Sequence, residues 1–375
     1  SFMDEYKNIE ALLQIVQPGM EAGNAFADII SGKVTPSGKM TDSWAYKYED
    51  YPNSKTFSHN NGNVDKEYYT EGLYVGYRYF DSFDVPVRYG FGYGLSYTTF
   101  ETKVVSAVLK DNKIVVETET TNTGNTYSGK EVIQLYATCP AGKLEKEYRR
   151  LVAFGKTGLL AAGQSEKMIL EIALDKLTSY SESEAAWILE KGSYVIWAGN
   201  SLEDSFPCAV FDLDADVTLT KTQNICPLKE ELEELKQPSE KMNQKLAALL
   251  KLTEEKNLPV LELKAADVVT RVVKYHSNAE CVPAEAREFV DTLSTEKLVA
   301  LASGDPGKGQ GSNLGSAGIA VPGSAGETND CALEDGIPGI VLSDGPAGLR
   351  LMKHYNVYEG KIVNKPFKFT MEGGL

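Results

Sequence analysis

Hydrophobic and polar positions change their spacing several times along the 375 residues, and each change marks a different kind of element. Residues 9–16 are rich in apolar side chains and lead to a Pro-Gly pair. The stretch from Glu21 to Ile30 then has the composition of a short helix, with Glu21 suited to its first turn and Gly32 to its end. An apolar run followed by a helix is typical of the last unit of an α/β domain, which we expect over residues 1–42.

Residues 43–100 combine many aromatic side chains with glycines and show no clear period. Two interpretations are open: an arm that its rings anchor to a domain surface, or a platform on which sugar rings stack. The structural interpretation is favoured, because aromatic side chains fill cores and interfaces more often than they contact ligands. The rings in question are Tyr74, Tyr77, Tyr79, Phe80, Tyr89, Phe91, Tyr93 and Tyr97.

Residues 101–217 alternate short β-branched or aromatic runs with turn groups. The clearest runs are 114–120, 132–136 and 194–198, and Asn122 to Asn125 is the clearest turn. Short strands punctuated in this way over about 110 residues predict an antiparallel β-sandwich.

A helical composition follows, with leucines among Glu and Lys over residues 227–262, which predicts amphipathic linker helices. Further helices are expected between 283 and 302, where Ser294 is a suitable N-cap. The glycine-rich segment 304–326 contains a Gly-Lys pair, but Gly309 follows Lys308 where a phosphate loop needs Ser or Thr. A nucleotide site is therefore not expected.

The apolar run Ile340 to Leu342 predicts a buried parallel strand that ends at a Ser-Asp-Gly-Pro turn. In α/β barrels the carboxyl ends of strands carry the site, so Asp344 is a candidate for binding or catalysis. Arg350 follows six residues later, and such a pair can bind neighbouring sugar hydroxyls, the carboxylate accepting and the guanidinium donating. A structural ion pair that holds the turn is an equally good interpretation.

The net charge and the composition of the chain limit the kinds of molecule that it is expected to bind. The formal net charge of −15 disfavours nucleic acid and anionic lipid, whereas neutral sugars meet no such penalty. Five scattered cysteines and three isolated histidines predict no metal site, no cofactor and no Ser-His-Asp triad. No apolar run reaches the roughly 18 residues of a membrane span, and the N-terminus lacks a signal-peptide pattern. We therefore expect a cytoplasmic protein, from a sequence whose first residues do not resemble a natural start.

Several segments together resemble glycoside hydrolase family 3. Residues 344–350, Asp-Gly-Pro-Ala-Gly-Leu-Arg, resemble the signature at the end of the first strand of that family's (β/α)8 barrel. The family's matching Asp and Arg hold the non-reducing sugar in the −1 subsite, and the resemblance gives this role to Asp344 and Arg350. The other similar segments are 18–25 and 36–39 for the end of the α/β sandwich domain, 76–81 and 91–100 for the stretch after it, and 122–132 and 149–154 for a fibronectin type III-like domain.

The resemblance implies a multi-domain protein, α/β plus all-β, in permuted order, because the family usually places the barrel first. Met20 and Ala22 replace the more usual Gln and Gly, in a motif that we interpret as a structural helix start. The expected parts are the C-terminal part of the α/β sandwich domain (1–42), a connecting arm (43–100), the fibronectin type III-like β-sandwich (101–217), a helical linker (218–265) and the incomplete first part of a (β/α)8 TIM barrel (266–375).

The implied activity is retaining hydrolysis of terminal, non-reducing β-D-glucosyl residues from a β-glucoside or oligosaccharide. The family's nucleophile is an Asp in a Ser-Asp-Trp-like segment, and no Asp-Trp dipeptide occurs here. Its acid/base Glu typically precedes the Pro-Gly motif, upstream of Ser1. No catalytic residue is therefore assigned, and we expect the chain alone to be inactive until a second chain or fragment completes it. A non-catalytic carbohydrate-binding or scaffold protein, and a fragment without an independent role, are the alternatives.

Overall fold

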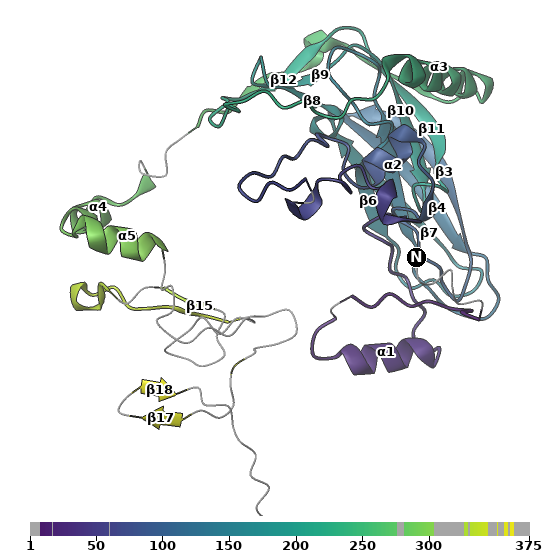
Figure 1. Ribbon diagram of the computed structural model, residues 1–375. Helices are drawn as coiled ribbons and strands as arrows, with labels where there is room; N and C mark the ends of the chain where they lie inside the picture. The colour runs from purple at the N-terminus through teal and green to yellow at the C-terminus, as the bar shows by residue number, and fades with distance from the viewer. Residues whose placement is uncertain are drawn as a thin grey trace, which may run out of the picture. The chain divides into compact units, whose positions relative to one another are not determined.

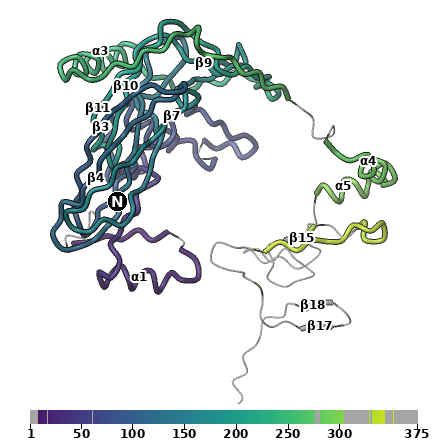
Figure 2. The backbone as a smooth tube through the Cα atoms, turned by 180° about the vertical axis from the view of Figure 1, so that it is seen from behind, coloured from purple at the N-terminus to yellow at the C-terminus, as the bar shows by residue number. Residues whose placement is uncertain are grey.

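The computed structural model describes residues 8–16, 18–59, 61–275, 281–303, 326–328, 331–343, 351, 356–358 and 361–363. The chain forms two compact units, the first made of residues 1–9 and 31–275 and the second of residues 10–30 and 276–375. Figures 1 and 2 show the elements of both units from opposite sides.

The first unit contains a β-sandwich, an arm before it and a helix after it. Its strands are β1 Trp44–Ala45, β2 Val87–Tyr89, β3 Phe100–Lys110, β4 Lys113–Asn122, β5 Val132–Thr138, β6 Arg150–Lys156, β7 Ser165–Ala173, β8 Ser179–Ser181, β9 Ala186–Leu189, β10 Gly192–Gly199, β11 Phe206–Leu213, β12 Val217–Lys221, β13 Val260–Leu263 and β14 Arg271–Val272. Its α-helices are α2 Tyr77–Phe83 and α3 Ser239–Glu255, and its 3-10 helices are η2 Tyr48–Asp50, η3 Phe57–His59, η4 Leu174–Leu177 and η5 Ala265–Asp267.

Two sheets supply the main core of the sandwich. One has the order β3-β4-β7 and the other the order β13-β11-β10-β5-β6, and a side sheet has the order β14-β12-β9-β8. Strand β4 shows why the sheets pack, because every second side chain from Ile114 to Asn122 is buried. Ile114 and Ile172 from the first sheet meet Leu135 and Ile196 from the second in one apolar cluster.

The predicted antiparallel sandwich is thus confirmed, and the three runs predicted as strands are β4, β5 and β10. All pairs within the β3-β4-β7 sheet and between β11, β10, β5 and β6 are antiparallel.

The segment after the sandwich corrects one prediction. A helix is present where linker helices were predicted, but it covers only Ser239–Glu255. Residues 260–263 form β13, which pairs in parallel with β11. The reason is a two-residue alternation, since Leu261 and Leu263 are buried whereas Val260 and Glu262 are exposed. The expected helical linker therefore also contributes a strand to the sandwich.

The second unit contains short elements: α1 Ala22–Ile30, α4 Ala284–Asp291, α5 Thr295–Ser303, η7 Leu333–Asp335, and the strand pairs β15 Gly326–Glu327 with β16 Val341–Leu342 and β17 Asn356–Tyr358 with β18 Lys361–Val363. The predicted helix ending at Ile30 is α1. The Ser294 hydroxyl accepts a hydrogen bond from the Lys297 N–H at 3.3 Å, which confirms it as the N-cap of α5. Within the described parts of both units, no helix has the length and apolar character to cross a membrane.

The strand predicted at Ile340 to Leu342 differs from the expectation. Strand β16 is antiparallel to β15, and the side chains from Ile340 to Leu342 are exposed. The physical reason is that its only strand partner among the described residues is the two-residue β15, so no sheet surrounds the apolar run. A buried parallel barrel strand is therefore not what the described residues form.

The arm is anchored to the sandwich by its aromatic rings. Tyr77 stacks on Phe91 with ring centroids 4.4 Å apart and lies edge-on to Tyr136 of β5. The Tyr77 hydroxyl accepts a hydrogen bond from the Leu151 N–H at 2.8 Å. Tyr74 is fully buried, and its hydroxyl donates to Glu145. The structural interpretation is confirmed for these rings, which bury apolar area and satisfy their polar tips.

A buried ion pair fixes α2 against the sandwich. Arg149 donates from Nε to Asp81 at 3.0 Å and pairs a second time through Nη2, with side chains only 12% and 9% exposed. Its remaining donors reach the Leu202 carbonyl and the Ser205 hydroxyl, and its guanidinium lies 5.0 Å from the centre of the Trp197 ring. Burial alone would lower the pKa of Arg149, but the hydrogen bonds and charge of Asp81 outweigh it and raise that pKa.

We predict that Arg149→Met destabilises the first unit by about 3–5 kcal/mol, because it leaves the Asp81 carboxylate buried without its cation. Urea unfolding followed by tryptophan fluorescence measures the change. The matched control is Lys113→Met, which removes an ion pair to Glu171 in which both side chains are about half exposed. Equal unfolding curves for the two variants would show that the buried pair does not hold the arm.

A second prediction concerns the cysteines. Burial raises the pKa of the Cys139 thiol, and raises that of Cys208 to about 12, whereas Cys226 and Cys281 are exposed. Because the thiolate is the reactive form, iodoacetamide at pH 8 should label Cys226 and Cys281 within minutes and leave Cys139 and Cys208 unmodified. Peptide mass mapping measures this, and urea should make all four react. Rapid labelling of Cys208 in the folded chain would contradict the expectation.

Candidate functional site

The predicted sugar-binding residues, Asp344 and Arg350, lie outside the residues that the structure describes. The described chain reaches Ser343, directly after β16, and resumes at Leu351. Whether the two side chains meet stays a prediction.

The arm borders an open hollow of about 320 Å³, which we call the arm pocket. It is lined by Asn53, Thr56, Phe57, Ser58, His59, Glu67, Tyr68, Tyr69 and Glu71. Figure 1 shows this dark blue part of the first unit as a loop that stands off the sandwich.

Local backbone geometry creates the arm pocket. The Asn53 carbonyl accepts hydrogen bonds from the N–H groups of Thr56 and Phe57, which begins a tight turn. Ser58 and His59 then adopt left-handed backbone conformations, with φ of 55° and 63°. Two adjacent residues other than glycine in this region are costly and persist only where their surroundings hold them. The reversal turns the chain back so that residues 67–71 face residues 53–59 across the hollow.

Glu67 holds that reversal in place. Its carboxylate accepts from the backbone N–H of His59 at 3.3 Å and lies 3.1 Å from Nδ1 of the same residue. This contact places Nδ1 beside the carboxylate and leaves Nε2 with no described partner. The pair is partly exposed, at 45% for His59 and 26% for Glu67.

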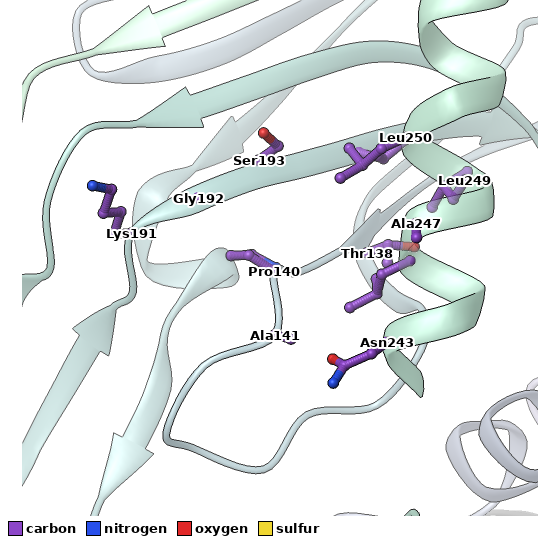
Figure 3. A pocket seen from close by; sticks show the side chains of 12 residues that line it. Thr138, Pro140, Ala141, Lys191, Gly192, Ser193, Asn243, Ala247, Leu249 and Leu250 are labelled. Atoms are coloured by element: carbon purple, nitrogen blue, oxygen red, sulfur yellow. The ribbon is translucent and has the colours of Figure 1, made fainter. Parts of the chain in front are cut away.

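A second hollow, the helix pocket, lies between α3 and the sheet and holds about 360 Å³. Figure 3 shows Leu249 and Leu250 of α3 facing Thr138 and Pro140 of the sheet side. The hydroxyl of Thr138 already accepts from the Trp197 indole N–H at 2.9 Å. The walls of the helix pocket are mainly apolar, so this pocket offers few hydrogen-bonding groups to the hydroxyls of a sugar.

No described group of His, Cys, Asp or Glu side chains could hold a metal ion. The buried charges near Arg149 are paired: Arg149 with Asp81 of the arm, and Arg150 with Glu147. Of the two pockets, only the arm pocket is lined by aromatic, carboxylate and imidazole side chains.

Sequence reasoning missed the arm pocket. The rings selected from the sequence begin at Tyr74 and are buried or half-buried except for the exposed Tyr97, whereas Phe57, Tyr68 and Tyr69 were passed over. The available signal was the placement of these rings beside His59 and Glu67 in a stretch rich in Asn, Ser and Gly, which is typical of an exposed loop.

Comparisons with known proteins agree with this architecture. Residues 2–77 match the glycosyl hydrolase family 3 C-terminal domain, and residues 131–202 match the fibronectin type III-like domain. A β-glucosidase A from Butyrivibrio fibrisolvens is 32% identical over 93% of this chain and 45% of its own length. A β-glucosidase from Ruminococcus albus is 31% identical over 99% of this chain and 39% of its own length.

A solved structure is similar as well. The crystal structure of a β-glucosidase from Paenibacillus barengoltzii has a TM-score of 0.61 and 30% identity, over 88% of this chain and 37% of that one. The chain thus spans less than half the length of these relatives.

The order of the two matched domains, a C-terminal domain of the family followed by a fibronectin type III-like domain, fits a permuted or partial arrangement. The chain is thus similar to glycoside hydrolase family 3 through its match to that family's C-terminal domain, and to β-glucosidases over nearly its whole length.

Proposed function

We propose that this chain forms part of a retaining β-glycosidase that removes terminal, non-reducing β-D-glucosyl residues. The observation that carries the proposal is the extent of the match to two proteins named β-glucosidases, which covers 93% and 99% of the chain. A linear alignment of that extent requires the relatives to carry the same segments in the same order. It therefore supports the permuted order in which a barrel follows the fibronectin type III-like domain.

Within this proposal the domain limits are those expected from the sequence, and residues 266–375 are the first part of the (β/α)8 barrel. The described residues contain no closed barrel, so this assignment rests on the relatives. A cytoplasmic location likewise stays a prediction.

Asp344 and Arg350 supply the sugar contacts in the proposed enzyme. The Asp344 carboxylate accepts hydrogen bonds from neighbouring hydroxyls of the terminal glucosyl ring, and the Arg350 guanidinium donates to an adjacent oxygen. Such charge-assisted hydrogen bonds fix the ring so that its anomeric carbon faces the nucleophile.

The bond-breaking groups lie elsewhere in the proposed enzyme. A retaining glycosidase needs two carboxyl groups about 5–5.5 Å apart, one as nucleophile and one as acid/base. We infer that neither belongs to these 375 residues, and that a further polypeptide segment or a second chain supplies both.

Our third prediction follows: the purified chain alone does not hydrolyse 4-nitrophenyl β-D-glucoside, as measured by nitrophenolate release. Turnover that disappears in Asp344→Ala would contradict this placement of the catalytic pair.

The fourth prediction concerns the enzyme that contains the catalytic pair together with this chain. There, Asp344→Ala lowers kcat/KM by about 10- to 100-fold, because one charge-assisted hydrogen bond is worth about 1.5–3 kcal/mol. Arg350→Ala should lower it similarly, whereas the exposed Lys113→Met should leave it unchanged. If sugar binds but no turnover occurs even with the complementary part present, the chain is instead a non-catalytic carbohydrate-binding protein.

A further inference from the structure

Three exposed rings of the arm lie around the arm pocket, whereas the exposed rings of Tyr46, Tyr48 and Tyr97 do not line it. Phe57 and Tyr69 are 56% and 77% exposed, and Tyr68 is 39% exposed. All three line the arm pocket, whereas Tyr74 and Phe80 are buried. These three rings are not buried within the described residues, and exposed rings around one hollow are typical of a binding site.

Some polar side chains of the arm pocket have partners, since the Thr56 hydroxyl donates to the Asn53 carbonyl and His59 contacts Glu67, and others do not. Those of Asn53, Ser58 and Glu71 make no hydrogen bond to any described residue. His59 keeps Nε2 available, because Glu67 engages only Nδ1 and the backbone N–H. The hollow therefore presents acceptors at Glu71 and donors that include the Asn53 amide and the Ser58 hydroxyl.

This mixture of donors and acceptors selects the chemistry of the ligand. A cation would use only the carboxylates and the ring faces, and an anion would be repelled by two glutamates. A sugar hydroxyl both donates and accepts, and the apolar C–H face of a pyranose can lie against an aromatic ring. A hollow of about 320 Å³ falls at the small end of the range for ligand pockets, which suits a short saccharide.

Backbone strain at the arm pocket also supports a binding site there. Ser58 and His59 both have left-handed conformations and line the arm pocket, and Glu67 binds the backbone N–H of His59. A strained reversal that positions ring, hydroxyl and imidazole around one hollow is a common feature of binding loops.

We propose that the arm pocket is a carbohydrate-binding site for a neutral oligosaccharide, separate from the proposed Asp344–Arg350 contacts. Tyr69 and Phe57 provide apolar faces for sugar rings. Asn53, Ser58, His59 and Glu71 provide the hydrogen bonds, and Glu67 is a positioning residue that keeps His59 in its conformation. This site goes beyond the hydrolytic function proposed above, since it acts through residues of the first unit alone.

The test, and our fifth prediction, measures binding of cellotriose to the full 375-residue chain by isothermal titration calorimetry. Tyr69→Ala and Glu71→Gln should each weaken binding about three- to tenfold, because each removes one stacking face or one charged acceptor. Neither change should shift the unfolding midpoint, since neither the exposed Tyr69 ring nor the Glu71 carboxylate has a described partner. Phe154→Ala is the matched control, because Phe154 is 68% exposed on β6 and lies outside the arm pocket.

Asp344→Ala separates this proposal from the hydrolytic one. Cellotriose binding that survives Asp344→Ala and weakens in Tyr69→Ala supports the arm pocket, whatever the catalytic outcome. Binding lost in Asp344→Ala and unchanged in Tyr69→Ala overturns it, and so does the absence of binding at millimolar cellotriose. Tetramethylammonium that binds in a Tyr69-dependent way while cellotriose does not would identify a cation site and would also overturn it.

Discussion

The attachment of the arm to the sandwich depends on one buried, bidentate ion pair between Asp81 and Arg149. Arg149 directly precedes β6, and Asp81 lies on α2, so the pair joins segments that are 68 residues apart. Two charges removed from water are stable only when their hydrogen-bonding capacity is used, and the remaining Arg149 donors are used by the Leu202 carbonyl and the Ser205 hydroxyl. The pair therefore specifies one position for α2, and the aromatic contacts of Tyr77 and Phe91 pack around that position.

That constraint also explains why the arm carries two kinds of aromatic residue. Close to the pair, the chain approaches the sheet, and glycine suits position 92 because its φ of 79° is left-handed and a Cβ would displace the amide of Gln134. Farther from the pair, around residues 53–71, the chain leaves the sandwich and its rings stay exposed. A rigid scaffold with a projecting loop is a common arrangement for ligand recognition, because the scaffold fixes the position of the loop and the loop carries the side chains that contact the ligand.

The sequence predicted the local features of the fold but not the long-range ones. The β-branched run from Ile114 to Thr120 identified β4, because such side chains fit a pleated, half-buried strand. The partnership of Tyr77 with Tyr136 was not predictable, since nothing in the sequence selects one partner among many rings. Strand β13 was missed because Leu261 and Leu263 lie in a stretch whose Glu, Lys and Leu content is typical of helices. For the site, Asp344 and Arg350 were found only through a family motif, and the arm pocket depends on backbone reversals that leave little trace in composition.

The parallel strand β13 has a consequence for how the chain avoids self-association. In the order β13-β11-β10-β5-β6, β13 occupies the outer position and covers the hydrogen-bonding edge of β11. An uncovered eight-residue strand such as β11 would be a template on which strands of other molecules could add. The cover is only four residues long and carries Glu262 in its middle, and both features discourage further strand addition. The segment that links the sandwich to the sequence beyond it thus also guards the sheet against aggregation.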